Sequence, residues 1–140
     1  MEQQQKQKIL DFIRYHTIGV IATATKDGQP EAAVVQFAET PDLHLIFNTF
    51  KTYRKYSNLQ QNPHIAFVIG WEDVTVQYEG TARELSGAEL ETHKKTFLEK
   101  LPGAKKWDAY EETRYFVIEP TWIRYNDLRE SQKEAFVVTF

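Results

Sequence analysis

An Asp-Gly pair lies between two apolar runs near the start of the chain, and this pattern restricts the fold more than any other feature of the sequence. Residues 18–25 are rich in β-branched side chains, and residues 31–38 form a second apolar run after Asp27-Gly28. Asp-Gly is the strongest local signal for a hairpin, because both central positions of a two-residue turn need positive φ. The pattern therefore predicts two antiparallel strands joined by a tight turn.

Short apolar runs separated by turn residues continue along the rest of the chain. Alternation predicts further strands at 43–48, 64–70, 73–85 and 114–125, with the tail 135–140 as a candidate seventh strand. Helical spacing predicts helices at 2–15, 52–61 and about 87–100, the last opened by a capping box of Ser86 and Glu89. Gly80 predicts a bend or a bulge in its strand. Hairpins dominate this order, so we expect a mainly β (α+β) fold, a small antiparallel barrel with flanking helices.

The composition fits one domain, residues 1–140, and excludes several classes of protein. With 0 Cys, disulfide frameworks, cysteine nucleophiles and thiolate metal sites are excluded. The net charge of −3 provides no general attraction for nucleic acid or anionic membranes. No apolar run approaches the ~20 residues that span a bilayer, and residues 1–8 are too polar for a secretory signal. We therefore expect a cytoplasmic protein.

Familiar catalytic motifs are missing from the sequence. The four histidines have no spacing typical of a metal site, so we expect no metal. No Gly-x-Ser-x-Gly motif, dinucleotide fingerprint or P-loop is present. The carboxylates form no evident acid and base pair, and we assign no catalytic residue. Protein-only hydrolysis is therefore disfavoured.

Positive side chains gather where the predicted helix 52–61 begins. Lys51, Arg54 and Lys55 are three cations within five residues, without an acid among them. A helix N-terminus carries partial positive charge and favours Asp or Glu, so this placement is unfavourable unless an anion binds there. A phosphate could accept hydrogen bonds from the free backbone N–H groups and from the side chains of Arg54 and Lys55. It could also accept one from the hydroxyl of Thr49 or of Thr52, the predicted N-cap. The alternative is a solvated basic patch.

A phosphate is one end of a ligand, and the other end needs a platform. Two strand segments offer backbone groups and short polar side chains beside apolar surface, which suits a flat heterocycle with amide-like edges. These segments contain Val34, Val35 and Gln36, and Thr75 and Gln77. The alternative is that Gln36 and Gln77 simply belong to solvated strand faces.

The segment 18–86 resembles the FMN-binding split-barrel family, the relatives of pyridoxamine 5′-phosphate oxidase. The order and spacing of the motifs match that family with hardly a gap. The matching residues are Asp27-Gly28-Gln29-Pro30, Leu45-Ile46-Phe47-Asn48-Thr49, Tyr53-Arg54-Lys55, Asn58-Leu59, Asn62-Pro63 and Gly80-Thr81-Ala82-Arg83-Glu84-Leu85-Ser86.

This resemblance implies a six-stranded antiparallel split barrel and a homodimer that holds FMN in a groove at the subunit interface. By position, Arg54 and Lys55 would bind the FMN phosphate, in agreement with the charge at the helix start. The resemblance also assigns cofactor contacts to the following strand residues: Asn48 and Thr49; Val34, Val35 and Gln36; Thr75 and Gln77; and Trp122 and Arg124, which would reach the partner's flavin.

Two departures from the family pattern bear on the activity. Ala33 stands where the oxidase has a phosphate-contacting arginine, and Ala38 where it has a lysine used for substrate. We therefore expect an FMN-dependent oxidoreductase that does not oxidise pyridoxine phosphate at a useful rate. The alternative is a protein of the same fold without turnover, which carries flavin or haem or serves in a stress response.

Overall fold

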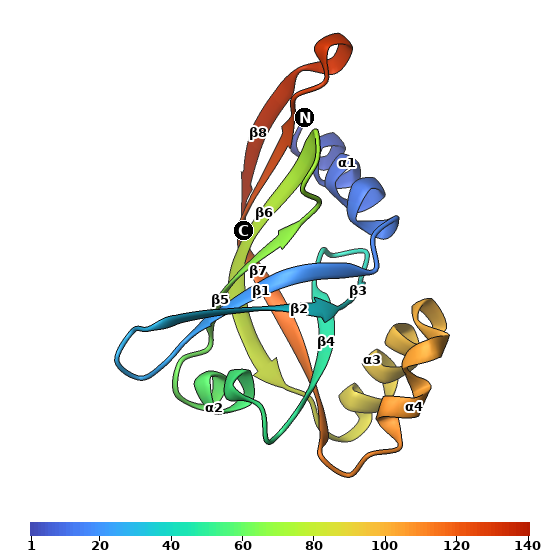
Figure 1. Cartoon of the computed structure of the whole chain (residues 1–140). Helices are drawn as coiled ribbons and strands as arrows, with labels where there is room; N and C mark the ends of the chain where they lie inside the picture. Colours follow the sequence, from blue (N-terminus) through green and yellow to red (C-terminus); the bar gives the residue numbers. More distant parts are fainter.

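An antiparallel sheet of eight strands forms the centre of the computed structural model, which describes residues 1–140 apart from the side chain of residue 132 (Figure 1). Its hydrogen-bonded order is β2-β1-β5-β6-β7-β4-β3, and β8 pairs with β7. The strands are β1 (Ile18–Ala24), β2 (Pro30–Gln36), β3 (Ala38–Glu39), β4 (Leu45–Phe50), β5 (His64–Ile69), β6 (Val74–Glu84), β7 (Thr113–Asp127) and β8 (Glu134–Thr139).

Helices lie beside and below this sheet (Figure 1). They are α1 (Glu2–Arg14), α2 (Arg54–Gln61), α3 (Gly87–Lys100), α4 (Lys105–Asp108), and the 3-10 turns η1 (Pro102–Ala104) and η2 (Glu130–Gln132). The α2 helix packs against β1 and β4, and α3 packs against β3, β4 and β7. Among the described residues, no helix has the length and apolar character needed to cross a membrane.

The predicted hairpin is confirmed, with a different turn. β1 and β2 pair from Ile18↔Gln36 to Ala24↔Pro30. The backbone N–H of Thr25 donates to the carbonyl of Gln29, so the loop has three residues, 26–28. Only Gly28 has positive φ in this loop, at 88°, because a three-residue loop needs one left-handed position where a two-residue turn needs two.

A single residue joins the two ends of the sheet. The predicted strand 31–38 ends at Gln36, and Ala38 already pairs with Ile46 of β4 at the opposite end of the strand order. Phe37 makes this bend; its side chain is buried, and its N–H donates to the carbonyl of Thr17. Because β2 and β3 are only one residue apart, the sheet must curl until its ends approach each other.

The mainly β antiparallel fold with flanking helices is therefore confirmed, and the number of strands is corrected from six to eight. The break at Phe37 separates β3 from β2, and the tail forms β8 along the free side of β7. The capping box is wrong: Ser86 is the N-cap of α3 without a side-chain hydrogen bond. Glu89 instead receives two hydrogen bonds from the Arg83 guanidinium, at 2.6 and 2.7 Å.

The curled sheet encloses an aromatic and aliphatic core. Phe37 and Phe67 meet edge to face, and Phe47 stacks on Phe116. Tyr78 is buried among them, and its hydroxyl donates to the carbonyl of Leu43 at 2.7 Å. The burial of alternate residues along β6, with Gln77 and Glu79 exposed, agrees with the alternation that predicted this strand.

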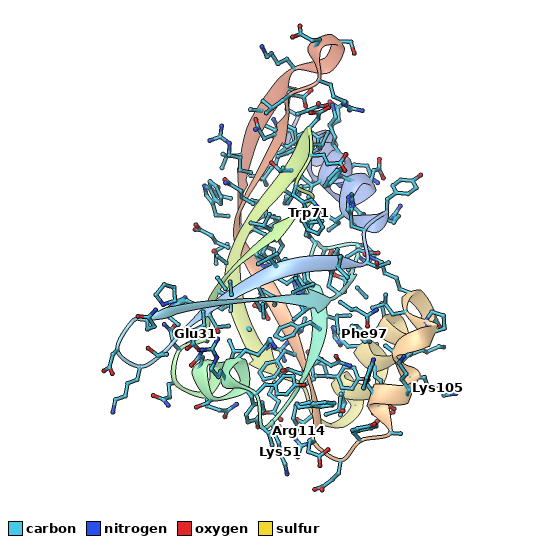
Figure 2. The ribbon with its side chains drawn as sticks, viewed as in Figure 1. Glu31, Lys51, Trp71, Phe97, Lys105 and Arg114 are labelled. Atoms are coloured by element: carbon cyan, nitrogen blue, oxygen red, sulfur yellow. The ribbon has the colours of Figure 1, made fainter. Side chains whose placement is uncertain are left out.

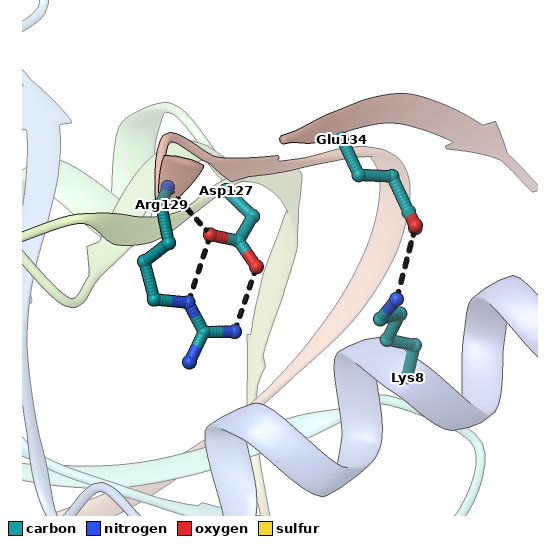
Figure 3. A network of polar contacts seen from close by, with 4 residues as sticks. All are labelled: Lys8, Asp127, Arg129 and Glu134. Atoms are coloured by element: carbon teal, nitrogen blue, oxygen red, sulfur yellow. Dashed lines mark hydrogen bonds and ion pairs between the residues drawn. The ribbon is translucent and has the colours of Figure 1, made fainter. Parts of the chain in front are cut away.

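One ion pair joins the β7–β8 hairpin to α1, and a second lies within the hairpin (Figure 3). Lys8 of α1 pairs with Glu134 at 3.0 Å. Arg129 donates two side-chain hydrogen bonds to Asp127, at 3.0 and 2.7 Å, and these bonds lower the pKa of the Asp127 carboxyl. These charged contacts therefore lie at the turn end of the hairpin, away from α2.

The bulge at Gly80 provides a direct stability test. The register of β6 against β7 shifts between Glu79 and Gly80, and a Cβ added at Gly80 would lie 2.3 Å from the carbonyl oxygen of Glu119. Gly80→Ala is expected to lower the free energy of unfolding in urea by about 2 kcal/mol, because backbone must move to admit the methyl group. Gly103→Ala is the control, since a Cβ there meets nothing within 4 Å. Equal stability of the two variants would contradict this account of the bulge.

Candidate functional site

Two adjoining grooves lie where β2 passes α2 and β4. The first has a volume of about 480 Å³ and the second about 280 Å³, sizes near those of small-molecule sites. They share Val34, Tyr53 and Lys55. The first is also lined by Ile21, Thr23, Glu31, Ala32, Ala33, Thr52 and Arg54, and the second by Val35, Gln36, Asn48, Thr49, Phe50 and Trp107.

The curl of the sheet creates these grooves. β2 and β4 approach each other after the bend at Phe37, but β2 pairs only with β1. One edge of β2 therefore has no strand partner, and its backbone N–H and C=O groups on that side can bind a ligand. Sequence reasoning predicted Val34, Val35 and Gln36 as the platform, and the structure places all three along this edge strand.

The helix α2 brings both predicted phosphate ligands to the grooves. Arg54 and Lys55 are its first two residues, and its first turn contains no acid. The predicted N-cap, Thr52, is wrong: Tyr53 occupies that position with extended backbone and no side-chain cap. The chain still turns at Thr52, since the N–H of Tyr53 donates to the carbonyl of Phe50. The first N–H groups of α2 thus receive no side-chain acceptor from the cap residue.

Lys55 is a half-buried cation shared by the two grooves. Its Nζ lies 3.5 Å from the Thr49 hydroxyl and 5.2 Å from the centre of the Tyr53 ring. Burial lowers the pKa of Lys55, and the neighbouring charge of Arg54 lowers it further. No ion pair to Lys55 is found within the described part of the chain. The negative charge of an anion in the groove would oppose both effects, because it favours the protonated ammonium.

Arg54 has a partner that sequence reasoning missed. Its Nη1 forms an ion pair with Glu31 of β2 at 3.0 Å. The Glu31 carboxylate also accepts a hydrogen bond from the Asn58 amide at 2.9 Å, and that amide donates to the hydroxyl of Thr23 as well. The labelled Glu31 lies beside α2 in Figure 2. The only sequence signal for it is its place on the inward face of β2, opposite Thr23.

The second groove combines an amide, a hydroxyl and aromatic rings. Thr49 is buried, and the buried Nδ2 of Asn48 has no hydrogen-bond partner among the residues that the structure describes. Phe50 packs edge to face on Tyr53 and lies 6.3 Å from Trp107, ring centre to ring centre. No local sequence signal places Trp107 here, because α4 reaches the groove only through the tertiary fold.

The remaining predicted contacts lie elsewhere on the sheet. Thr75, Gln77, Trp122 and Arg124 line neither groove; Gln77 pairs with Arg124 across β6 and β7. Cross-strand pairing places Val34, Val20, Val68, Gln77 and Arg124 in one row on the outer face. From Val34 to Gln77 is three strand spacings, about 14 Å. Within one copy of the chain, the four predicted residues on β6 and β7 are therefore too far from β2 to contact a small ring that is bound at β2.

The groove residues fit a ligand with an anionic end and a planar polar end. Two cations and free helix N–H groups suit a phosphate. The unpaired Asn48 amide, the Thr49 hydroxyl and the free edge of β2 suit carbonyl and N–H groups on a ring. FMN has both ends, and so the residues present fit it. Among the described residues, no group of three or more His, Asp or Glu side chains could hold a metal ion.

Comparison with known proteins gives a consistent family assignment. Residues 5–127 match a family model described as pyridoxamine 5′-phosphate oxidase. General stress protein 26 of Bacillus subtilis (strain 168) is 30% identical over 94 residues, which cover 64% of this chain and 66% of that protein. A pyridoxine/pyridoxamine 5′-phosphate oxidase of Salinibacter ruber is 38% identical over 71 residues, covering 49% of this chain and 33% of the oxidase.

A solved structure shows the same fold. The structure of a haem-binding protein from Mycobacterium smegmatis superimposes with a TM-score of 0.82 at 18% identity, over 99% of this chain and 58% of that protein. The sequence matches cover only a third of the Salinibacter ruber oxidase and about two thirds of the stress protein. The comparisons thus establish the fold and the family, whereas the ligand and the activity have to be argued from the residues of the site.

Proposed function

The chain belongs to the pyridoxamine 5′-phosphate oxidase family, as its motifs predicted, and we propose that it is an FMN-dependent oxidoreductase that works as a homodimer. In this proposal residues 1–140 act as one FMN-binding unit, with FMN in the two grooves between β2, β4 and α2. The substrate is not pyridoxine phosphate: Ala33 brings no charge to the groove and Ala38 is buried.

The observation that carries this proposal is the state of Lys55. It is half buried, lines both grooves, stands in the first turn of α2 and has no acidic partner among the described residues. Burying an unpaired ammonium costs free energy, and so does placing it at the positive end of a helix. A phosphate bound against Lys55 and Arg54 removes both costs.

The other groove residues orient the rest of the cofactor. The free edge of β2 at Val34 to Gln36 lies beside the ring edge, where backbone groups and the Gln36 amide can hydrogen-bond. Asn48 supplies an amide donor and Thr49 a hydroxyl beside Lys55. FMN, once bound, supplies the electron and hydride chemistry, and these residues bind and orient it.

A second copy of the chain completes the site in this proposal. The outer face carries exposed apolar side chains in one continuous row, including Val34, 64% exposed, and Val68, 37% exposed. Such a face favours burial against another surface. Gln77 and Arg124 continue this row, with Thr75 and Trp122 beside them on the same face. Two copies packed through this face would bring these four residues of one copy to the FMN of the other.

The alternative is a carrier of flavin or haem without turnover. Haem iron needs an axial ligand such as His, Cys, Met or Tyr. Among the described residues that line the two grooves, Tyr53 is the only such side chain. The cations at α2 and the polar edge of β2 favour FMN over haem, since they match a phosphate and a heterocycle.

The phosphate assignment is tested by removing both cations. Arg54→Ala combined with Lys55→Ala is expected to weaken FMN binding by roughly a hundredfold or more, because two charge-assisted contacts are lost. The titration follows quenching of flavin fluorescence, and thermal unfolding checks that the fold is retained. Lys95→Ala with Lys133→Ala removes the same charge at exposed positions. If both pairs of substitutions leave FMN affinity unchanged, the phosphate does not bind at α2.

The dimer is tested on its outer face. Val68→Glu puts a carboxylate into the exposed apolar row and is expected to convert a dimer into a monomer in sedimentation velocity, with weaker FMN binding. Leu128→Glu changes an exposed apolar residue at the end of β7 instead and should leave the dimer intact. Wild-type protein that sediments as a monomer would rule out the shared site.

Turnover is tested by a reduced nicotinamide. The second groove is open beside the β2 edge, so a planar hydride donor can reach the bound ring. Mixing FMN-loaded protein with NADPH or NADH without oxygen should bleach the flavin absorbance, as hydride passes from nicotinamide to flavin. Bound flavin that no donor reduces would support the carrier instead.

A further inference from the structure

An acidic side chain stands inside the cation cluster, and we propose that Glu31 sets how much negative charge the groove accepts. Glu31 acts as a built-in counterion to Arg54, and it weakens the binding of a doubly charged phosphate relative to a neutral flavin. This inference rests on the proposed flavin site. It concerns the selectivity of that site between phosphorylated and unphosphorylated ligands.

The position of Glu31 is fixed from the core side. Its carboxylate is only 16% exposed, whereas the Arg54 side chain is 76% exposed. One oxygen accepts from the buried Asn58 amide at 2.9 Å, and the other pairs with Arg54 at 3.0 Å. Asn58 is itself anchored by Thr23 at 2.9 Å. The carboxylate therefore cannot turn away when an anion enters the groove, because its own partner is buried.

The net charge of the cluster matches a ligand group with one negative charge better than a group with two. Arg54 and Lys55 contribute two positive charges, and Glu31 cancels one of them. Arg54 already offers one edge of its guanidinium to Glu31, so an incoming phosphate shares this side chain with a carboxylate. The Glu31 carboxylate and a phosphate would repel each other if both contacted the Arg54 guanidinium. The burial of Glu31 limits the screening of this repulsion by salt. Of this pair of cations, Lys55 alone has no acidic partner among the described residues, whereas a bound phosphate would share Arg54 with Glu31.

A purely structural role and a counterion role for Glu31 predict opposite changes in FMN affinity when its charge is removed. If Glu31 served only to hold Arg54 in place for the phosphate, its neutralisation would release the guanidinium and weaken FMN binding. If Glu31 is the counterion, its neutralisation leaves one more unpaired positive charge and strengthens FMN binding. Riboflavin has the same ring as FMN but no phosphate. A comparison of the two ligands therefore separates the effect of the phosphate charge from the effect of the ring's shape.

The experiment compares FMN and riboflavin on the same variants. Glu31→Gln keeps an oxygen that can accept from Asn58 and Arg54 but removes the charge. We expect its FMN affinity to rise by about tenfold while its riboflavin affinity stays unchanged. Glu31→Ala serves as the second variant if the glutamine form unfolds. Glu72→Gln is the charge-matched control, because Glu72 is exposed at the β5–β6 turn, next to Trp71, and Figure 2 shows the labelled Trp71 well away from the labelled Glu31.

Three results would overturn the inference, and they can be told apart. An unchanged or lowered FMN affinity in Glu31→Gln, with wild-type protein still binding FMN, rejects the role of Glu31 and leaves the proposed function standing. Failure of wild type and all variants to bind either flavin rejects the proposed function together with it. An equal rise in the affinity for FMN and for riboflavin also rejects the inference about Glu31, because the effect would then not involve the phosphate.

Discussion

The bend at Phe37 is the constraint on which the site depends. It is the single residue between β2 and β3, which lie at opposite ends of the strand order. A sheet connected in this way must curl, and its ends then approach without pairing. The gap leaves one edge of β2 open, directly beside the end of β4 and the start of α2. Both grooves follow from this closure. The first is lined by β1, β2 and the start of α2, and the second by β2, β4, the start of α2 and Trp107.

Electrostatics then decides what such a gap can bind. The first turn of α2 presents two cations at a positive helix end, which is unfavourable in the absence of an anion. Glu31 compensates Arg54 from the neighbouring strand, and Lys55 has no comparable partner. The groove thus favours a negative group near Lys55, and in the proposed dimer the outer apolar face of a second copy would cover the rest of the ligand.

The features that were predicted from the sequence are those with local causes. The hairpin follows from Asp27-Gly28, the bulge from Gly80, and the cations at α2 are consecutive in sequence. Glu31 was missed because its partners lie on α2 and meet it only through the packing of that helix against β1. Trp107 was missed for the same reason. Thr52 failed as the N-cap because the chain stays extended for one more residue, at Tyr53.

A crystal structure of the protein with FMN tests the central claim most directly. The account predicts phosphate density against Lys55 and the first turn of α2, with the ring along the edge of β2. It also predicts that Gln77 and Trp122 approach that ring from a second copy related by two-fold symmetry. Density for FMN elsewhere, or a filled groove with no second copy near the ring, would contradict it.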